Sequence, residues 1–277
     1  MNVLRIAAFS DGEFGGNPAG VVIADEIPTV EQMQKVAAHV GFSETAFAAQ
    51  VGSCWRVRYF SPASEVPFCG HATIALGAAL ALRHGDGVFA LILNQGEITV
   101  EGRRSDKVIA AALQSPPTRS TPVAPPLVSQ ALRLFGYTHE DLDLAIAPVI
   151  AHAGADHLVL MLNSRGALAA MKYDFDAGRA LMIREGWVTV LLGYAQTSRR
   201  FHTRNAFAYG GVYEDPATGA ATAALAGYLR EIEWPHEGSI EIVQGEDMGA
   251  RSLLRAEIMP TLGSSIRVSG TARVLSF

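Results

Sequence analysis

Two short polar motifs, far apart in the chain, each precede a long apolar segment. The first is Phe-Cys-Gly-His-Ala-Thr at residues 68–73, and the second is Glu-Asp-Pro-Ala-Thr-Gly at residues 214–219. The alanine-rich segments that follow predict helices. The N-terminus of a helix presents unpaired N–H groups and a partial positive charge, so it binds anions without lysine or arginine. Two such helix ends facing one cleft would hold a carboxylated substrate.

Three side chains could act as acids or bases, two of them in these motifs and one in an earlier segment of the chain. His71 and Asp215 lie in the motifs, and Glu44 lies where a predicted helix is followed by a predicted strand. Each also has a structural interpretation. Asp215 before a proline is typical of a helix N-cap, His71 could cap or pack, and an acid such as Glu44 is often simply solvated. Cys69, beside an apolar run, is usually a small buried side chain.

Other catalytic and cofactor motifs are missing from the sequence. The glycines at residues 12–20 match neither a phosphate loop nor a dinucleotide-binding fingerprint. The histidines and cysteines show no metal-ligand spacing, and no Gly-x-Ser-x-Gly nucleophile motif occurs. The sequence therefore offers acid/base groups, and we expect no metal, no cofactor and no serine nucleophile.

The composition is that of a globular protein, with 49% hydrophobic and 18% charged residues among 277. The formal net charge of −5 gives no basic surface for nucleic acid and no polybasic attachment to a membrane. Two cysteines, Cys54 and Cys69, do not make a disulfide framework. The N-terminus lacks signal-peptide features, and the most apolar run, residues 72–82, is shorter than the ~20 residues of a membrane span. We expect a cytoplasmic protein.

Short β-type segments separated by turn residues occur along the whole chain. They are residues 3–9, 20–24, 45–49, 55–60, 88–93, 98–101, 108–114, 158–162, 188–193, 200–207, 240–243, 252–258 and 266–275. One amphipathic helix is expected at residues 29–40, with Thr29 and Gln32 as a capping box and Gly41 as its end. Residues 72–83 and 219–230 differ, because they are apolar nearly all round and must be covered on every side.

The order of strands, enclosed alanine-rich helix and further strands occurs twice. This predicts an α/β (α+β) fold of two similar halves, each a rolled β-sheet around a central apolar helix. The proline-rich residues 115–126 are interpreted as a linker or crossover. The expected halves are therefore residues 1–118 and 119–277.

Six segments, taken in order, resemble the phenazine-biosynthesis PhzF-like family of the diaminopimelate epimerase-like superfamily. They are Gly16-Asn17-Pro18-Ala19-Gly20, Ser43-Glu44-Thr45-Ala46-Phe47, Tyr59-Phe60-Ser61-Pro62, Glu65-Val66-Pro67-Phe68-Cys69-Gly70-His71-Ala72-Thr73, Glu214-Asp215-Pro216-Ala217-Thr218-Gly219 and Gln244-Gly245. Each segment alone is a weak signal, but the ordered set is specific. The resemblance implies an active site between two halves of this fold, a last strand near residues 266–277 that packs with the first half, and a homodimer.

The resemblance also implies roles for individual residues. In the family's best-known enzyme, the glutamate that corresponds to Glu44 relays a proton between carbons of a cyclic dienyl amino acid. His71 and Asp215 would position and support that transfer, and backbone N–H groups near Gly70 and Gly219 would hold the substrate carboxylate. The other substrate-binding candidates of the two motifs are Cys69, Thr73, Thr218 and Ala220.

Two departures from the family pattern concern the substrate. The phenazine enzyme carries serine where this chain has Ala220, so a hydroxyl contact is lost and an identical substrate is not expected. Cys69 stands where related epimerases and racemases keep one of two catalytic thiols. Residues 215–219 hold no second thiol, so a two-thiol racemase is not expected.

The expected function is a cofactor-independent isomerase that moves a proton on carbon of a small carboxylated, amino-acid-like metabolite. One alternative is a one-cysteine racemase or epimerase that uses Cys69 with Asp215 or Glu44. Another is a non-catalytic binding module on the same fold, because a fold does not determine a function. The sequence does not identify the substrate, and we expect no nucleic-acid or membrane partner.

Overall fold

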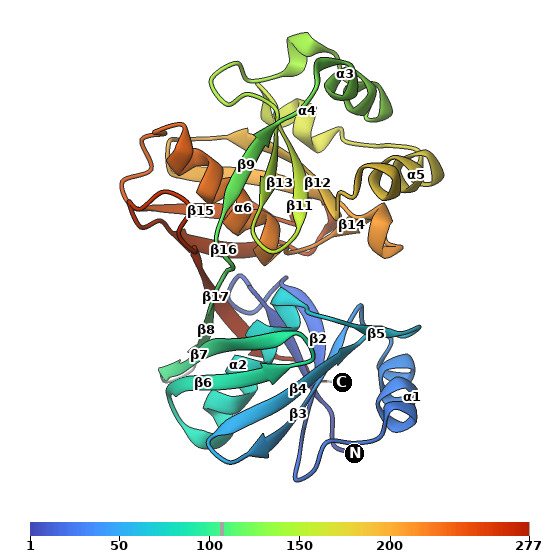
Figure 1. Cartoon of the computed structure of the whole chain (residues 1–277), viewed down its shortest axis with the longest axis vertical. Coiled ribbons are helices and arrows are strands. Elements are labelled where there is room, and N and C mark those ends of the chain that lie inside the picture. Colours follow the sequence, from blue (N-terminus) through green and yellow to red (C-terminus); the bar gives the residue numbers. More distant parts are fainter. Residues whose placement is uncertain (106–107, 277) are drawn as a thin grey trace. The chain divides into compact units, whose positions relative to one another are not determined.

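Residues 1–105 and 108–276 are described in the computed structural model. The chain divides into two units, one of Met1–Gln114 with Ser269–Phe277 and the other of Ser115–Val268. Each unit combines one long buried helix with a mixed sheet (Figure 1). Among the described residues, no helix has the length and apolar character needed to cross a membrane.

The first unit is an eight-stranded barrel. Strand pairing closes the ring in the order β1, β2, β3, β4, β6, β7, β8, β17 and back to β1. The strands are β1 (Leu4–Ala8), β2 (Asn17–Ala24), β3 (Thr45–Val51), β4 (Cys54–Phe60), β6 (Gly87–Leu93), β7 (Gly96–Ser105), β8 (Val108–Gln114) and β17 (Arg267–Val274). Helix α1 (Val30–Val40) packs outside the ring. The two-residue strand β5 (Glu65–Val66) pairs antiparallel with the end of β4.

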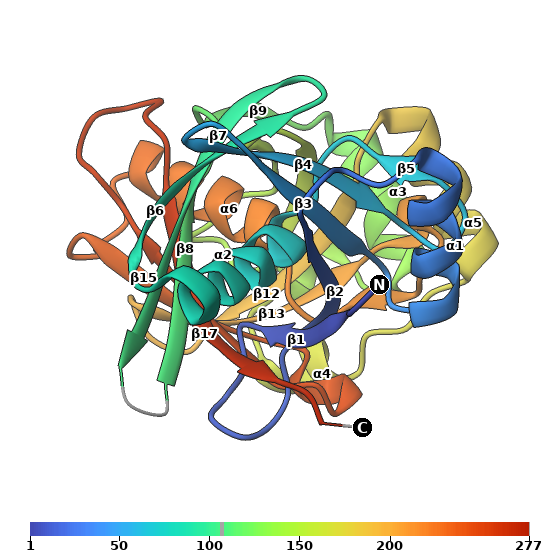
Figure 2. The ribbon, with the colours of Figure 1, turned by 90° about the horizontal axis from the view of Figure 1, so that it is seen from below.

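Helix α2 (Gly70–His84) lies inside this ring (Figure 2). Every residue from position 71 to position 81 is buried. Small side chains let the helix approach the strands closely. A Cβ atom on Gly102 of β7 would lie 2.2 Å from the carbonyl oxygen of Gly77 in α2. The expectation of an enclosed helix at residues 72–83 is confirmed.

The second unit is built on seven strands paired in the order β9, β10, β11, β12, β13, β15, β16. They are β9 (Arg119–Pro122), β10 (Val149–His152), β11 (Asp156–Met161), β12 (Thr189–Ala195), β13 (Arg200–Ala206), β15 (Ser239–Gln244) and β16 (Ser252–Glu257), and β14 (Glu214–Asp215) extends β13. One face of the sheet packs on α6 (Gly219–Glu231), which is buried along nearly all of its length. Three helices, α3 (Pro125–Leu134), α4 (Arg165–Ala169) and α5 (Phe175–Glu185), cover the other face through an apolar cluster (Figure 1).

The two units repeat one strand pattern. The pairs alternate between antiparallel and parallel along β1, β2, β3, β4, β6, β7, and again along β10, β11, β12, β13, β15, β16. In each unit the central helix begins five residues after the first residue of a two-residue strand, at Gly70 after Glu65 and at Gly219 after Glu214. The predicted fold of two similar halves, each with a sheet around a central helix, is therefore confirmed.

The proline-rich residues 115–126 are more regular than a linker. They contain strand β9, which pairs with β10, and the start of helix α3. Pro125 and Pro126 are the first two residues of that helix, where the missing proline N–H costs no hydrogen bond. Strand β10 and helices α3, α4 and α5 were also not predicted from the sequence.

Candidate functional site

Glu44, Cys69 and His71 come together in the first unit. Cys69 is the N-cap of α2, His71 lies in its first turn, and Glu44 directly precedes β3. The Nε2 atom of His71 lies 3.4 Å from Oε2 of Glu44, and its Nδ1 atom lies 3.4 Å from Sγ of Cys69. The imidazole therefore stands between a carboxyl group and a thiol.

Burial differs between the two members of the carboxyl–imidazole pair. The side chain of His71 is 7% exposed and that of Glu44 is 15% exposed. Ser43 adds a hydroxyl 3.3 Å from Nε2 of His71. The ring is thus held by neighbours on several sides, while part of the Glu44 side chain is exposed. A partly reachable carboxyl group backed by an imidazole can take and return a proton.

A short hydrogen-bonded chain fixes the start of α2. The hydroxyl of Thr73 donates to the carbonyl of Cys69, at 2.7 Å. The hydroxyl of Tyr59 lies 2.6 Å from Oγ1 of Thr73, and since the Thr73 proton is already donated, Tyr59 is the donor. Burial raises the pKa of Tyr59, which keeps its proton in place. Thr73 was predicted to contact the substrate, and in the structure its hydroxyl holds the start of α2 in place.

In the second unit Asp215 ends strand β14 and is 8% exposed. The hydroxyl of Thr218 donates to its Oδ2 atom, at 2.5 Å. Thr218, and not Asp215, is the N-cap of α6. The interpretation of Asp215 as a helix cap is therefore wrong, because the cap position lies three residues further on and the carboxylate accepts from the cap residue instead.

Gln244 organises the turn between Asp215 and α6. Its Oε1 atom accepts from the backbone N–H of Thr218 at 3.1 Å, and its Nε2 atom donates to the carbonyl of Asp215 at 2.7 Å. The same Nε2 lies 3.0 Å from Oγ1 of Thr218. Gly245 follows with a φ of +72°, and a Cβ atom there would lie 2.8 Å from the carbonyl oxygen of Pro216. In the sequence Gln244 and Gly245 stand out only as a motif match, because their role depends on this contact.

Within the described part of the chain, the cap residue at the N-terminus of each central helix makes no side-chain cap hydrogen bond. Cys69 and Thr218 occupy the cap positions without accepting from the first turn. Other helices of the chain are capped by side chains, namely those of Thr29, Ser164 and Asp174. The first-turn N–H groups of α2 and α6, beginning at Gly70 and Gly219, therefore suit an external acceptor such as a carboxylate.

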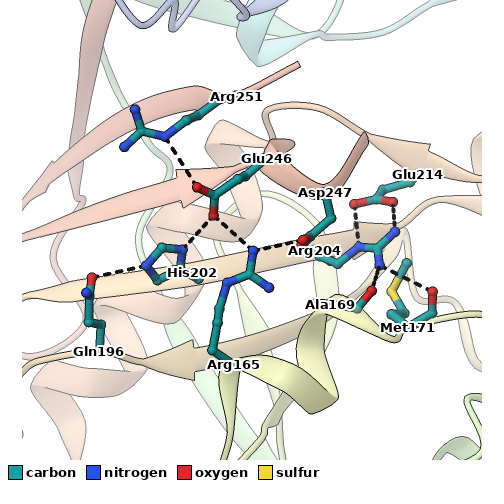
Figure 3. A network of polar contacts seen from close by, with 10 residues as sticks. All are labelled: Arg165, Ala169, Met171, Gln196, His202, Arg204, Glu214, Glu246, Asp247 and Arg251. Atoms are coloured by element: carbon teal, nitrogen blue, oxygen red, sulfur yellow. Dashed lines mark hydrogen bonds and ion pairs between the residues drawn. The ribbon is translucent and has the colours of Figure 1, made fainter. Parts of the chain in front are cut away.

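A buried ion pair fixes the strand that carries Asp215 (Figure 3). The guanidinium group of Arg204 donates to both oxygens of Glu214, at 3.0 and 2.5 Å, and to the carbonyls of Ala169 and Met171. The two side chains are 9% and 4% exposed. Buried charges of this kind are tolerated when the pair has further hydrogen-bond partners, such as the two carbonyls that accept from Arg204 here.

The first unit has the equivalent pair at its surface. Arg58 donates to the two oxygens of Glu65 at 2.7 and 2.5 Å, and these hydrogen bonds lower the pKa of Glu65. Glu65 pairs with Phe60 of β4, and Arg58 lies two residues before Phe60. In the same way Glu214 pairs with Ala206 of β13, and Arg204 lies two residues before Ala206. The ion pair is therefore part of the repeated architecture.

A second polar cluster holds the turn that follows Gln244 (Figure 3). Arg165 donates to Glu246 and Asp247, at 2.9 and 2.8 Å. His202 adds a contact of 3.1 Å between its Nδ1 atom and Glu246. These residues fix the single turn Glu246–Met248. Because Gln244 lies two residues before this turn, they also help to hold the Gln244 carboxamide that contacts Asp215.

The repeated pattern carries different chemistry in its two copies. Counted from Glu65 and Glu214, the equivalent pairs are Val66 with Asp215, Cys69 with Thr218 and His71 with Ala220. Phe60 pairs with Thr45 in the first unit, and its equivalent Ala206 pairs with Val190 in the second, which makes Thr189 the equivalent of Glu44. The first unit thus has the Glu–His–Cys group, and the second has the aspartate.

A buried polar chain on the inner face of the second unit had no signal in the sequence. His157 Nδ1 lies 2.8 Å from Oγ1 of Thr189, which donates to Oδ1 of Asn205 at 3.1 Å. Since the Thr189 proton goes to Asn205, Nδ1 of His157 is the donor and its Nε2 atom carries no proton. That Nε2 atom is buried without a partner among the described residues. Burial lowers the pKa of His157 to about 4. Asn205 pairs with Asp215 across β13 and β14.

Comparison with known proteins agrees with this architecture. Residues 6–276 match the family model described as phenazine biosynthesis-like protein, PhzC-PhzF. The trans-2,3-dihydro-3-hydroxyanthranilate isomerase of Pseudomonas chlororaphis is 30% identical over 273 residues, which cover 96% of this chain and 94% of that protein.

Solved structures show the same fold. A phenazine biosynthesis protein of the PhzF family from Bacillus anthracis matches with a TM-score of 0.87 at 22% identity, covering 99% of this chain and 96% of that one. A probable proline racemase from Agrobacterium radiobacter K84 matches with a TM-score of 0.66 at 10% identity, covering 99% and 91%. The chain therefore belongs to the phenazine biosynthesis-like PhzC-PhzF family, has the diaminopimelate epimerase-like fold and is an isomerase.

Proposed function

We propose that this isomerase moves a proton between carbon atoms of a small carboxylated, amino-acid-like metabolite, with Glu44 as the group that takes and returns the proton. The contact of 3.4 Å between Glu44 Oε2 and His71 Nε2 carries this proposal. It joins the partly exposed side chain of Glu44 to a buried imidazole in the first turn of α2. General acid/base groups placed in this way contribute roughly 10²–10⁴ in rate.

The helix ends supply the electrostatic part of the mechanism. Removing a proton from carbon next to a carboxyl group leaves negative charge on the substrate. The first-turn N–H groups of α2 and α6, at Gly70, Gly219 and Ala220, lie at the positive ends of the helix dipoles and suit that charge. No net positive charge on the protein is then required, in keeping with its formal net charge of −5.

Asp215 serves the same reaction from the second unit in this proposal. Its carboxylate is held by Thr218 Oγ1 and by the turn that Gln244 fixes. A carboxylate held in one orientation fits the ammonium group of an amino acid. Asp215 therefore binds and orients the substrate, and Glu44 moves the proton.

The substrate class follows from the relatives and from one difference. The Pseudomonas relative is named for trans-2,3-dihydro-3-hydroxyanthranilate, so that compound is the first to test. Ala220 has no hydroxyl to offer where the phenazine enzyme that this chain resembles has serine, so we expect a related amino acid to be the better substrate. A cytoplasmic homodimer remains our expectation, and light scattering of the purified protein measures the oligomeric state.

A one-cysteine racemase is the second candidate. The observation that favours it is the distance of 3.4 Å between Cys69 Sγ and His71 Nδ1, because an adjacent imidazole activates a thiol. The two candidates differ in their products. A racemase gives the mirror-image amino acid, whereas the proposed isomerase moves the proton to another carbon.

Proton NMR in heavy water tests the proposal. The purified chain is incubated with trans-2,3-dihydro-3-hydroxyanthranilate and with a panel of cyclic and linear amino acids. We expect deuterium at carbon in one of them, together with a product in which a double bond has moved. Inversion at one carbon without such a shift would favour the racemase. Binding of a compound in a thermal-shift assay, with no exchange in any, would favour the binding module.

A further inference from the structure

Glu44, Cys69 and His71 together offer the three kinds of side chain that bind zinc: a carboxylate, a thiolate and an imidazole. One donor atom from each lies within 4.8 Å of the other two. In tetrahedral zinc sites, with bonds of ~2.0–2.3 Å, donor atoms lie about 3.3–3.8 Å apart. The three donors thus need to close by about 1.5 Å at most to surround one ion.

The imidazole is the centre of this cluster. Its Nε2 atom is 3.4 Å from Glu44 Oε2, and Cys69 Sγ is 3.9 Å from Nε2 and 3.4 Å from Nδ1. An ion bound to Nε2 requires the thiol to turn toward that nitrogen, which is a side-chain rotation. The backbone at Cys69 is held in place, because its carbonyl accepts from the Thr73 hydroxyl at 2.7 Å.

Charge and burial also fit a divalent ion. Cys69 and His71 are 9% and 6% exposed, and the Glu44 side chain is 15% exposed. A thiolate and a carboxylate together neutralise Zn²⁺, so the occupied site carries no net charge into the protein interior. The thiol proton is released to solvent when the metal binds.

We propose that Glu44, Cys69 and His71 bind one Zn²⁺ ion, with its fourth coordination position open to water. Spacing in the sequence predicted no metal site, because Glu44 joins the other two ligands only through the barrel fold. An ion bound to Glu44 occupies the carboxylate that would accept the substrate proton. Zn²⁺ therefore inhibits the isomerase, and this consequence, unlike the binding itself, rests on the proposed function.

Cobalt substitution tests the site without any substrate. Co²⁺ replaces Zn²⁺ in such sites, and a cobalt–thiolate bond gives a near-ultraviolet charge-transfer band. The full chain, free of purification tags and treated with a chelator, is titrated with Co²⁺ and then with Zn²⁺. We expect a band that saturates at one Co²⁺ per chain and disappears when one equivalent of Zn²⁺ is added.

Variants identify the ligands. Cys69→Ser should lose the band, whereas Cys54→Ser, which removes the other cysteine of the chain, should keep it. Glu44→Gln should keep the band but weaken Co²⁺ binding by at least about tenfold, as loss of a metal contact does. Circular dichroism of each variant shows whether it is folded.

The outcomes separate this proposal from the proposed function. No band in the folded wild-type chain, or a band that persists in Cys69→Ser, would overturn the zinc site even if the isomerase is active. A cobalt band with the expected ligand pattern in a chain that exchanges no substrate proton would support the metal site. The same result would count against the isomerase mechanism.

Discussion

Val66 in the first unit and Asp215 in the second occupy the same place in a repeated strand pattern. Each is the second residue of a two-residue strand whose first residue is a glutamate paired with an arginine. Only the second copy has an acid there. The first copy has its acid, Glu44, directly before β3, where the second copy has Thr189. The two copies therefore carry their acids at different places in the repeated pattern.

Gln244→Leu should destabilise the chain and loosen Asp215. Gln244 is 0% exposed, and the change removes its hydrogen bonds to the N–H of Thr218 and the carbonyl of Asp215. Loss of a buried hydrogen-bond partner costs about 1–3 kcal/mol, so we expect the loss of two to cost about 2–6 kcal/mol. Urea unfolding measures it. Gln50→Leu, at an exposed position of β3, is the matched control and should change the stability by less than about 0.5 kcal/mol. Equal losses in the two variants would contradict the role of Gln244.

His157 should make the stability of the chain depend on pH between about 6.5 and about 4. Its pKa is lowered from 6.5 to about 4 in the folded state by burial. Between these values the unfolded chain binds a proton that the folded chain does not bind, so acid favours unfolding. The contribution is fully present above pH 6.5 and is lost as the pH falls towards 4. Its size is on the order of 3 kcal/mol.

The His157→Asn variant provides the comparison for this pH dependence. Its amide nitrogen can still donate to Oγ1 of Thr189 but does not titrate. Urea unfolding of both proteins across this pH range should give a steeper loss of stability for the wild type. Parallel pH profiles would show that His157 does not stay neutral in the fold.

Gly102→Ala should destabilise the first unit, because its Cβ atom would lie 2.2 Å from the carbonyl oxygen of Gly77 and 2.9 Å from Cβ of Ala81. Helix and strand must move apart, and overpacking of this kind costs about 1–3 kcal/mol. Gly166→Ala is the control, since a Cβ atom on this glycine in α4 meets nothing within 4 Å. Thermal unfolding should show a lower Tm for Gly102→Ala and none of that loss for Gly166→Ala. An unchanged Tm in Gly102→Ala would contradict the close approach of α2 to β7.

The sequence predicted the parts of the fold that composition alone determines. Helices α2 and α6 were found because a helix without a polar face needs cover on every side. Helix α1 was found through the capping box of Thr29 and Gln32, which the structure confirms. Helix α5 was missed although its signals are present: Asp174 caps its first turn, and Gly186 ends it with a φ of +73°.

Other features had no local signal that could reveal them. The two-residue strands β5 and β14 are too short to show a period, and their pairing with β4 and β13 defines the equivalence of Val66 and Asp215. The chain from His157 to Asn205 joins three strands, and such contacts follow from strand register rather than from spacing. The contact between Glu44 and His71 is of the same kind. Sequence reasoning reached it only through the resemblance to a family.

Cys69→Ala separates packing from chemistry at the start of α2. If Glu44 moves the proton, this variant should keep much of the exchange activity, because the thiol contacts His71 through Nδ1 and Glu44 contacts it through Nε2. The loss of one sulfur atom should cost on the order of 1 kcal/mol in stability. A folded Cys69→Ala protein without activity would favour the one-cysteine racemase.

Deuterium exchange by Glu44→Gln tests the central claim most directly. The carboxamide keeps the size of the side chain and can still hydrogen-bond to His71, but it cannot take and return a proton. The matched control is Glu26→Gln, the same change at an exposed position of the same unit. The measurement is proton NMR in heavy water with the compound that the wild-type chain exchanges. We predict that Glu44→Gln lowers the exchange rate by at least about 10², whereas Glu26→Gln exchanges at the wild-type rate. Exchange by folded Glu44→Gln at the wild-type rate would contradict the assignment of Glu44 as the acid/base group.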